Sequence, residues 1–369
     1  MKTGKFTLSL ILPCYNITPY ISDCIASICK AAQGHENEIE VILIDDGSTD
    51  HLEEKLKGLY KGTLDFKYYR YENAGTSTAR NRGINKATGM YMWFIDPDDT
   101  ITENSLSILL SLISGGGDAY YVSGNVKDTS CSSIDCSPLL NGKHQLSFNK
   151  DDIYNYVIPL YAGYSQKNLD RLYGGKTISD RGPYNGAMFH MIYQREIIMK
   201  NKIKFDPALN LSEDVMFALR YLAFVQNLTI TDDICYNYYP RESGALRNIL
   251  SHNVRSLVAN KMELALERQR ISQLYMERDN VDISPLYLGS LVLSSIELAV
   301  RLSSISLKGV SGVIDYVKLE PVRFAIRNLS VHGAPLKFKV PFSLLKLRCY
   351  RLLYACLWIA NRAGMKLYV

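Results

Sequence analysis

The feature that most constrains the fold is an alternation of short apolar runs and helix-like stretches over the first 126 residues. The apolar runs are rich in β-branched and aromatic residues, and they predict strands at 6–12, 39–44, 66–71, 90–95 and 119–122. Helix-like stretches lie between them, at 18–33, 50–60, 76–88 and 103–114. Strands that alternate with helices form layered sheets with right-handed crossovers. We therefore expect an α/β fold with a Rossmann-like, mostly parallel central sheet flanked by helices.

Acidic clusters follow two of these predicted strands. The second strand runs into DDGSTD at 45–50, and the fourth runs into DPDD at 96–99. One interpretation is structural, because Ser48, Thr49 or Asp50 can cap the helix that follows. Capping does not require so many carboxylates, however, and close carboxylates repel one another unless a cation offsets them. Ligands of such sheets bind beyond the carboxyl ends of the strands. An Asp-x-Asp pair at that edge suits Mg²⁺ or Mn²⁺.

Four motifs occur in order along this part of the chain. The first strand ends in P-x-Y-N at 13–16, DDGSTD follows the second, N-A-G-x-S-x-A-R-N occupies 73–81, and D-x-D-D follows the fourth. Together they resemble the inverting glycosyltransferases of family 2, which have the GT-A fold, over about residues 6–240. The resemblance implies that Pro13, Tyr15 and Asn16 line the pocket of a nucleotide base. It also implies that Asp46 accepts a hydrogen bond from the base, which favours uracil.

The same resemblance assigns roles to the next two motifs. Asn73 and Arg80 approach the nucleotide, and Arg80 either neutralises the diphosphate or holds the edge of the base. A surface ion pair is the structural alternative for Arg80. Asp98 binds a Mn²⁺ or Mg²⁺ ion directly, and Asp96 contacts the ribose or takes part in the metal site. Asp99 supports Asp96 and Asp98 without binding the ion itself.

Family 2 enzymes also need a base for the acceptor hydroxyl, in an acidic motif that opens a later helix. The sequence LSEDVMF at 211–217 resembles that motif. Asp214 matches the catalytic base, Glu213 tunes it or holds the acceptor, and Ser212 reads as the N-cap. The structural alternative is that acids in a first turn interact favourably with the helix dipole. More loosely, the stretch Tyr236–Arg247, with Arg241 and Ser243, resembles the segment that closes over the diphosphate.

The remainder of the chain changes in character. We expect an irregular insertion at 127–150 and a long polar binding loop at 163–183. The GGKT within that loop lacks the first glycine and the preceding strand of a phosphate-binding P-loop, so we reject that interpretation. Helical segments are expected at 252–275 and 284–305. The predicted domains are a catalytic domain at 1–240 and a helical region at 241–369, with a basic amphipathic tail from about 335.

The tail differs in charge from the rest of the chain. Residues 321–369 hold 9 Lys and Arg and no Asp or Glu, whereas residues 1–100 hold 11 basic and 14 acidic residues. A helix over 342–366 would place Arg348, Arg351, Arg362 and Lys366 on one face, opposite Leu345, Leu353, Leu357 and Ala360. Such a helix either lies on an anionic membrane or docks a partner, including another copy of the chain. Nucleic-acid binding is disfavoured because residues 1–100 are acidic overall.

These observations predict a metal-dependent, inverting glycosyltransferase that uses a nucleotide sugar, a UDP-sugar in particular. Its expected acceptor is a hydroxyl of a growing, lipid-linked cell-surface glycan such as a capsule or O-antigen. Two alternatives remain, a non-catalytic sugar-nucleotide-binding or assembly subunit and a nucleotidyltransferase. The eight cysteines have no paired framework, and neither a secretory signal nor an 18-residue apolar run is apparent. We therefore expect a cytoplasmic protein at the inner face of the cytoplasmic membrane.

Overall fold

The computed structural model describes residues 6–59, 64–126, 137–174, 190–241, 254–305 and 309–363. The chain divides into two compact units. Unit 1 comprises Met1–Ile158, Gly182–Pro207 and Glu213–Glu242, and unit 2 comprises Pro159–Arg181, Ala208–Ser212 and Ser243–Val369. This division differs from a single cut at residue 240, because two earlier segments group with the C-terminal helices.

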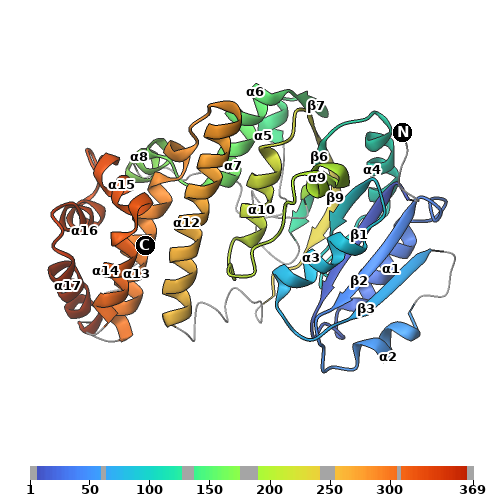
Figure 1. Ribbon diagram of the computed structural model, residues 1–369, viewed down its shortest axis with the longest axis horizontal. Helices are drawn as coiled ribbons and strands as arrows, with labels where there is room; N and C mark the ends of the chain where they lie inside the picture. The colour runs from blue at the N-terminus through green and yellow to red at the C-terminus, as the bar shows by residue number, and fades with distance from the viewer. Residues whose placement is uncertain are drawn as a thin grey trace. The chain divides into compact units, whose positions relative to one another are not determined.

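Unit 1 is built on one mixed sheet with the strand order β3-β2-β1-β4-β8-β6-β9-β5, in which β7 also pairs with β9. The first four strands, shown side by side in part in Figure 1, are mutually parallel: β1 (Leu8–Cys14), β2 (Ile39–Asp45), β3 (Asp65–Arg70) and β4 (Tyr91–Phe94). The expected α/β class is confirmed. Every residue of β1 and β2 is buried, as in parallel strands covered on both faces.

The other half of the sheet mixes strand directions. It contains β5 (Thr100–Ile101), β6 (Ala119–Val126), β7 (Gln145–Phe148), β8 (Met191–Gln194) and β9 (Leu228–Tyr238). β8 runs antiparallel to both β4 and β6, and β6 runs parallel to β9. The sequence analysis does not predict β9, since polar residues interrupt its apolar pattern and its pairing with β6 shifts register twice.

Four helices of unit 1 lie close to their predicted positions: α1 (Ile21–Ala31), α2 (Leu52–Lys57), α3 (Thr76–Lys86) and α4 (Ser105–Ser114). α10 (Glu213–Leu222) begins at the acidic motif, as predicted, whereas α9 (Arg195–Lys200) is not predicted. In α1 the buried side chains recur at helical spacing, as Ile21, Cys24, Ile25 and Ile28. This face of α1 belongs to a hydrophobic core that also contains buried residues of β1, β2 and β4.

Two predictions about connecting segments need correction. The part of 127–150 that the structure describes is not irregular, because it contains α5 (Ser137–Leu140) and β7. It is followed by α6 (Lys150–Asp152), η1 (Ile153–Val157) and α7 (Ile158–Ala162). The expected loop at 163–183 contains a helix, α8 (Gln166–Tyr173), which opens where the Asn168 carboxamide accepts hydrogen bonds from the Ser165 backbone N–H and hydroxyl. Most of the GGKT sequence lies outside the described residues.

Unit 2 is helical where it is described, as predicted. It contains α8, α12 (Val254–Asp279), η3 (Ser284–Leu286), α13 (Leu288–Ile305), α14 (Val310–Lys318), α15 (Glu320–Asn328), α16 (Leu336–Lys346) and α17 (Tyr350–Arg362). Among the described helices α13 alone is long and apolar enough to cross a membrane, with a mean hydropathy of 1.4. Because 61% of it is buried, and α14, α15 and α17 pack against it, it serves as the core helix of this unit.

The single tail helix predicted at 342–366 is wrong. The chain forms α16 and α17 instead, and the break contains Arg348 at φ 59°, which is not a helical conformation. Leu345, Leu353, Leu357 and Ala360 are nevertheless buried, as the periodicity predicts. Lys366 lies outside the described residues.

Candidate functional site

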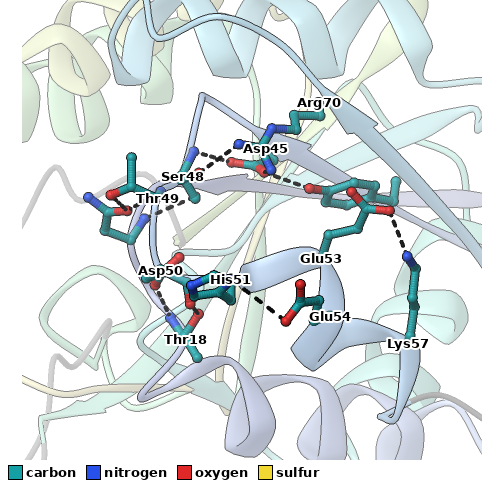
Figure 2. A network of polar contacts seen from close by, with 12 residues as sticks. Thr18, Asp45, Ser48, Thr49, Asp50, His51, Glu53, Glu54, Lys57 and Arg70 are labelled. Atoms are coloured by element: carbon teal, nitrogen blue, oxygen red, sulfur yellow. Dashed lines mark hydrogen bonds and ion pairs between the residues drawn. The ribbon is translucent and has the colours of Figure 1, made fainter.

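The DDGSTD loop after β2 is hydrogen-bonded to the loop after β1 (Figure 2). The Ser48 hydroxyl accepts a hydrogen bond from the Asn16 backbone N–H at 3.0 Å, and the Asn16 side-chain oxygen accepts one from the Thr49 N–H at 2.8 Å. The Asp50 carboxylate accepts a hydrogen bond from the Thr18 N–H at 2.8 Å. Two loops at the same sheet edge are thereby held in one arrangement.

These contacts contradict the capping interpretation of Ser48, Thr49 and Asp50. The residue before α2 is His51, which has φ 60° and makes no side-chain capping bond. The polar side chains face the neighbouring loop instead of the helix. The first carboxylate of the motif, Asp45, is also structural, because it accepts hydrogen bonds from the Ser48 N–H at 2.8 Å and from the Tyr68 hydroxyl.

Asp46 organises the third motif. Its carboxylate accepts hydrogen bonds from the backbone N–H groups of Ala74 and Gly75, at 3.0 and 2.7 Å, and from Nη1 of Arg82 at 2.7 Å. The side chain is almost fully buried. The loop that contains Asn73 packs closely against Gly47, which has φ 80°. A Cβ at this position would lie 2.9 Å from the Asn73 backbone nitrogen, so the close packing requires glycine. The bond from Asp46 to a base stays a prediction.

The other residues expected at the base lie around this loop. Pro13 is buried in β1, whereas Tyr15 just beyond the strand has half of its surface exposed. Asn16 and Asn73 are exposed. Tyr15 is thus an accessible aromatic side chain at the carboxyl edge of the sheet, where the sequence analysis predicts stacking against a base.

The acidic turn after β4 is tied to β9. The Tyr236 hydroxyl donates to Oδ2 of Asp99 at 2.8 Å and accepts from the Asp96 backbone N–H at 3.1 Å. Oδ1 of Asp99 accepts from the Tyr239 N–H at 2.8 Å, and Nη2 of Arg241 donates to the Asp98 carbonyl at 2.8 Å. Asp99 therefore fixes the turn to β9. Ser243 lies outside the described residues.

Burial and neighbouring carboxylates raise the pKa of Asp98 and of Asp99 in this turn. Burial and the neighbouring Asp96 raise the pKa of Asp98 to about 6. Burial, Asp96 and Asp98 raise the pKa of Asp99 to about 8. Crowded carboxylates of this kind favour a divalent cation, which lowers their mutual repulsion and accepts oxygen ligands. The residues present at this turn therefore fit the expected Mg²⁺ or Mn²⁺.

Arg80 joins this turn to α10. Its Nη2 lies 3.1 Å from Oδ1 of Asp96, and its Nη1 lies 2.9 Å from Oε1 of Glu213. The guanidinium is buried and also lies over the Phe205 ring. The ion pair of the structural alternative is therefore present, but it is buried and does not lie on the surface. In this structure Arg80 binds two carboxylates of the protein itself, and its predicted contact with a nucleotide is untested.

The predicted base belongs to the same charged cluster. Burial, Glu213 and Asp96 raise the pKa of Asp214, whereas Arg80 and the Val215 N–H, 2.7 Å from Oδ1, lower it; the pKa reaches about 7. Ser212 precedes α10 as predicted, but at φ 62°, which is not the extended conformation usual for an N-cap.

Two networks contain Arg80 and the predicted acidic residues, whereas Pro13, Tyr15 and Asn16 belong to neither. The first holds Asp46 and the Asn73 segment, and the second, which we call the acidic cluster, contains Arg80, Asp96, Asp98, Asp99, Glu213 and Asp214. Helix α3 links them, because it carries Arg82 to the first and Arg80 to the second.

A family model described as glycosyl transferase family 2 matches residues 9–172. That segment contains β1, β2, α3 and the acidic turn after β4. This segment therefore belongs to glycosyltransferase family 2.

Curated relatives support this assignment over a larger part of the chain. The minor teichoic acid biosynthesis protein GgaB of Bacillus subtilis is 23% identical over 75% of this chain, but the match covers 28% of that protein. The uncharacterized glycosyltransferase YibD of Escherichia coli is 25% identical, over 67% of this chain and 65% of that protein. The cholesterol galactosyltransferase of Borreliella burgdorferi is 24% identical, over 72% and 69%.

A solved structure extends the likeness to both units. Residues 1–349 of Staphylococcus aureus TarS, solved in complex with UDP-GlcNAc, match with a TM-score of 0.64 and 16% identity. The match covers 98% of this chain and 93% of that one. At this identity the likeness shows the fold alone, which is a GT-A-like domain followed by helices.

Sequence reasoning missed two residues of this family 2 site. Arg82 forms an ion pair with Asp46. The feature of the sequence that could have indicated it is its position two residues after Arg80 on the same helix. Tyr236 binds Asp99 and the backbone of Asp96 from an unpredicted strand. Tyr236 begins the stretch that loosely resembles the segment closing over the diphosphate, but that resemblance does not predict its contact with Asp99, which lies 137 positions earlier in the chain.

A separate pocket of about 340 Å³ lies in unit 2 between α12, α13 and α15. Its lining includes Gln269, Tyr287, Glu320 and Phe324. None of the residues predicted from the motifs lines this pocket, so it is distinct from the acidic cluster.

Proposed function

We propose that this chain transfers a glycosyl group, with inversion, from a UDP-sugar to a hydroxyl of a growing, lipid-linked cell-surface glycan. The single observation that supports the proposal is the bridge that Arg80 makes between Asp96 and Glu213, because it joins the turn that carries the candidate metal ligands to the helix turn that carries Asp214. The two components of a displacement reaction are thereby brought to one end of the sheet.

Asp214 acts as the base in this proposal. The acceptor oxygen forms a bond to the anomeric carbon while the bond from that carbon to the diphosphate oxygen breaks, and Asp214 takes the hydroxyl proton. A pKa near 7 suits this role, since a base is most effective when its pKa lies near the working pH. The single displacement inverts the configuration of the sugar.

Asp98, together with Asp96, would hold the Mn²⁺ or Mg²⁺ ion. When bound, the ion stabilises negative charge on the departing nucleoside diphosphate as a Lewis acid. Asp99 keeps the turn that presents these carboxylates attached to β9.

The loops after β1 and β2 bind the nucleotide in this proposal. Tyr15 stacks on the base, Pro13 and Asn16 shape its pocket, and Asp46 and Asn73 contact its edge and the adjoining ribose. TarS, which shares this fold, was solved in complex with UDP-GlcNAc, and this supports a UDP-sugar donor. The name of GgaB, a teichoic acid biosynthesis protein, supports a cell-surface glycan as the acceptor.

The test is nucleoside diphosphate release with a panel of UDP-, GDP- and dTDP-sugars, with Mn²⁺ and with chelator. We expect release from a UDP-sugar that requires the metal and is accelerated by a glycan acceptor, with an inverted product anomer by NMR. Release of pyrophosphate from a nucleoside triphosphate would identify a nucleotidyltransferase instead. Binding of the UDP-sugar without turnover on any acceptor would identify a non-catalytic subunit.

A further inference from the structure

The last two helices of unit 2 expose large apolar side chains. The exposed fractions are 75% for Leu336, 52% for Val340, 71% for Leu347, 55% for Leu352 and 60% for Ile359. Apolar side chains exposed singly are common, but five within 24 residues form a concentrated group.

These side chains form one stripe on each helix. Leu336, Val340 and Leu347 follow one another at spacings of four and seven residues, which places them on one face of α16 and its C-terminal end. Leu352 and Ile359, seven residues apart, share a face of α17. We call these two stripes the apolar stripes.

The opposite faces of the same helices are used for packing. Phe342 and Leu345 of α16 are buried, as are Leu353, Tyr354 and Leu357 of α17. The apolar stripes are therefore not needed to attach the helices to unit 2, and within the described residues they remain exposed.

Basic side chains flank the apolar stripes. Lys339, Lys346, Arg348, Arg351 and Arg362 are exposed on these helices or between them. No Asp or Glu occurs from residue 321 to residue 369. At 100° per residue, Lys339 and Lys346 lie beside the stripe of α16, and Arg351 and Arg362 lie beside that of α17. A partner that binds this surface must therefore present both apolar groups and negative charges.

We propose that α16 and α17 dock on an anionic lipid bilayer. The apolar stripes enter the boundary between headgroups and acyl chains, and the flanking basic residues bind the lipid phosphates. Trp358 is half-buried on the side of α17 that carries Arg351 and Arg362, and the Arg362 guanidinium lies 5.1 Å from its ring centre. Tryptophan is enriched at membrane interfaces. The proposal depends on the chemistry of these helices and not on the proposed transferase activity.

The test is sedimentation of the full chain with phosphatidylcholine vesicles, with and without phosphatidylglycerol. We expect binding to the vesicles that contain phosphatidylglycerol and little binding to the others. Raising the salt concentration from about 0.1 M to about 1 M should weaken that binding, because the Debye length falls from about 10 Å to about 3 Å.

Trp358 provides a second, local measurement. The chain has 2 tryptophans, and Trp93 is fully buried in the core of unit 1. Lipids with brominated acyl chains should therefore quench the emission of Trp358 on binding and leave that of Trp93 unchanged. Absence of quenching in vesicles that do bind the protein would place the contact elsewhere on the chain.

Two variants separate the charges from the apolar stripes. K339Q/K346Q/R351Q should weaken binding to anionic vesicles about a hundredfold, since each basic residue near such a surface contributes about fivefold. L336S/V340S/L352S should abolish the quenching. The matched controls, K30Q/K55Q/K57Q and M199S/I234S, change exposed residues of unit 1 and should bind as the parent does.

Equal binding to neutral vesicles, or unchanged binding by the charge variant, would overturn the proposal. If the protein self-associates by light scattering, ignores vesicles, and becomes monomeric with L336S/V340S/L352S, the occupant is a second copy of the chain and the proposal is wrong. Nucleoside diphosphate release in solution should be unchanged in all these variants, so failure here is distinguishable from failure of the proposed function.

Discussion

Nη1 of Arg80 lies 2.9 Å from Oε1 of Glu213, and this ion pair joins two residues that are 133 positions apart in the chain. The same guanidinium binds Asp96 after β4. A single buried cation thus holds three segments together, α3, the acidic turn and the first turn of α10. This contact aligns the candidate base with the candidate metal ligands.

Replacing Arg80 by Gln should destabilise the fold and change the pH dependence of transfer. Removing one partner of a buried ion pair costs about 3–5 kcal/mol, because the remaining carboxylates lose their counter-charge. The pKa of Asp214 should rise, since Arg80 lowers it. Chemical denaturation and a pH–rate profile would measure both effects. Arg80→Lys keeps the charge and should lose less stability; if Arg80→Gln left both quantities unchanged, the bridge would have no structural role.

Transfer should slow as the pH falls below about 7. Asp214 accepts a proton only when it is ionised, and its pKa is raised to about 7, so the fraction of active enzyme decreases below that pH. Initial rates of nucleoside diphosphate release over a pH series would show this limb. Asp214→Asn should reduce transfer by about 10²–10⁴ and leave UDP affinity nearly unchanged. Transfer by Asp214→Asn at the parental rate would rule out the assigned role.

Asp98→Ala should remove the dependence of donor binding on metal. Titration of the parent with UDP should give tighter binding with Mn²⁺ than with chelator, because Asp98 would hold the ion and the ion would offset the negative charge of the diphosphate. The variant should bind UDP equally under both conditions. Asp65→Ala, which changes a half-buried carboxylate at the start of β3, is the control and should retain the metal effect. A metal effect that persisted in Asp98→Ala would place the ion elsewhere.

Gly47→Ala should weaken nucleotide binding and stability, because its Cβ would lie 2.9 Å from the Asn73 nitrogen. Gly34→Ala is a matched control, since Gly34 also has a left-handed φ, 83°, but no atom within 4 Å of the added Cβ. The backbone conformation costs about 1–2 kcal/mol in both variants, and only Gly47→Ala adds the clash. Denaturation and UDP titration of the pair isolate that difference. Identical losses in the two variants would show that the Asn73 loop moves aside freely.

His190 should make the fold less stable in mild acid. Burial lowers its pKa from 6.5 to about 4, although the Val122 carbonyl at 2.7 Å partly opposes the shift. The unfolded chain therefore binds a proton between these pH values while the folded chain does not. The contribution of His190 is complete above about 6.5 and is lost as the pH falls toward 4. We expect the parent to lose about 2 kcal/mol relative to His190→Phe between about pH 7 and pH 5. A constant difference in unfolding free energy between the two proteins would contradict this account.

Apolar runs and helical periodicity in the sequence predicted most of the strands and helices near the N-terminus. Continuous apolar runs marked β1 and β2 because both faces of a parallel strand are buried, and the helical periodicity located α1 and α13. Polar residues interrupt the apolar pattern of β9, so this strand was not predicted. A turn at Arg348 divides the C-terminal segment into two helices, whereas its periodicity predicts a single helix. Ser and Asp are common N-cap residues, but in the folded chain Ser48 and Asp50 accept hydrogen bonds from the backbone of Asn16 and Thr18 in the loop after β1.

The sequence alone determined the family, the α/β fold class and the identities of the acidic motifs, since motif order and apolar periodicity are properties of the chain itself. Only the tertiary structure decided that Arg80 bridges Asp96 to Glu213 and that Asp46 holds the Asn73 loop with Arg82. It also decided that the apolar stripes of α16 and α17 face away from the packed core. The physical reason is that side chains distant in sequence are brought together by strand pairing and helix packing, and charge and burial depend on those neighbours.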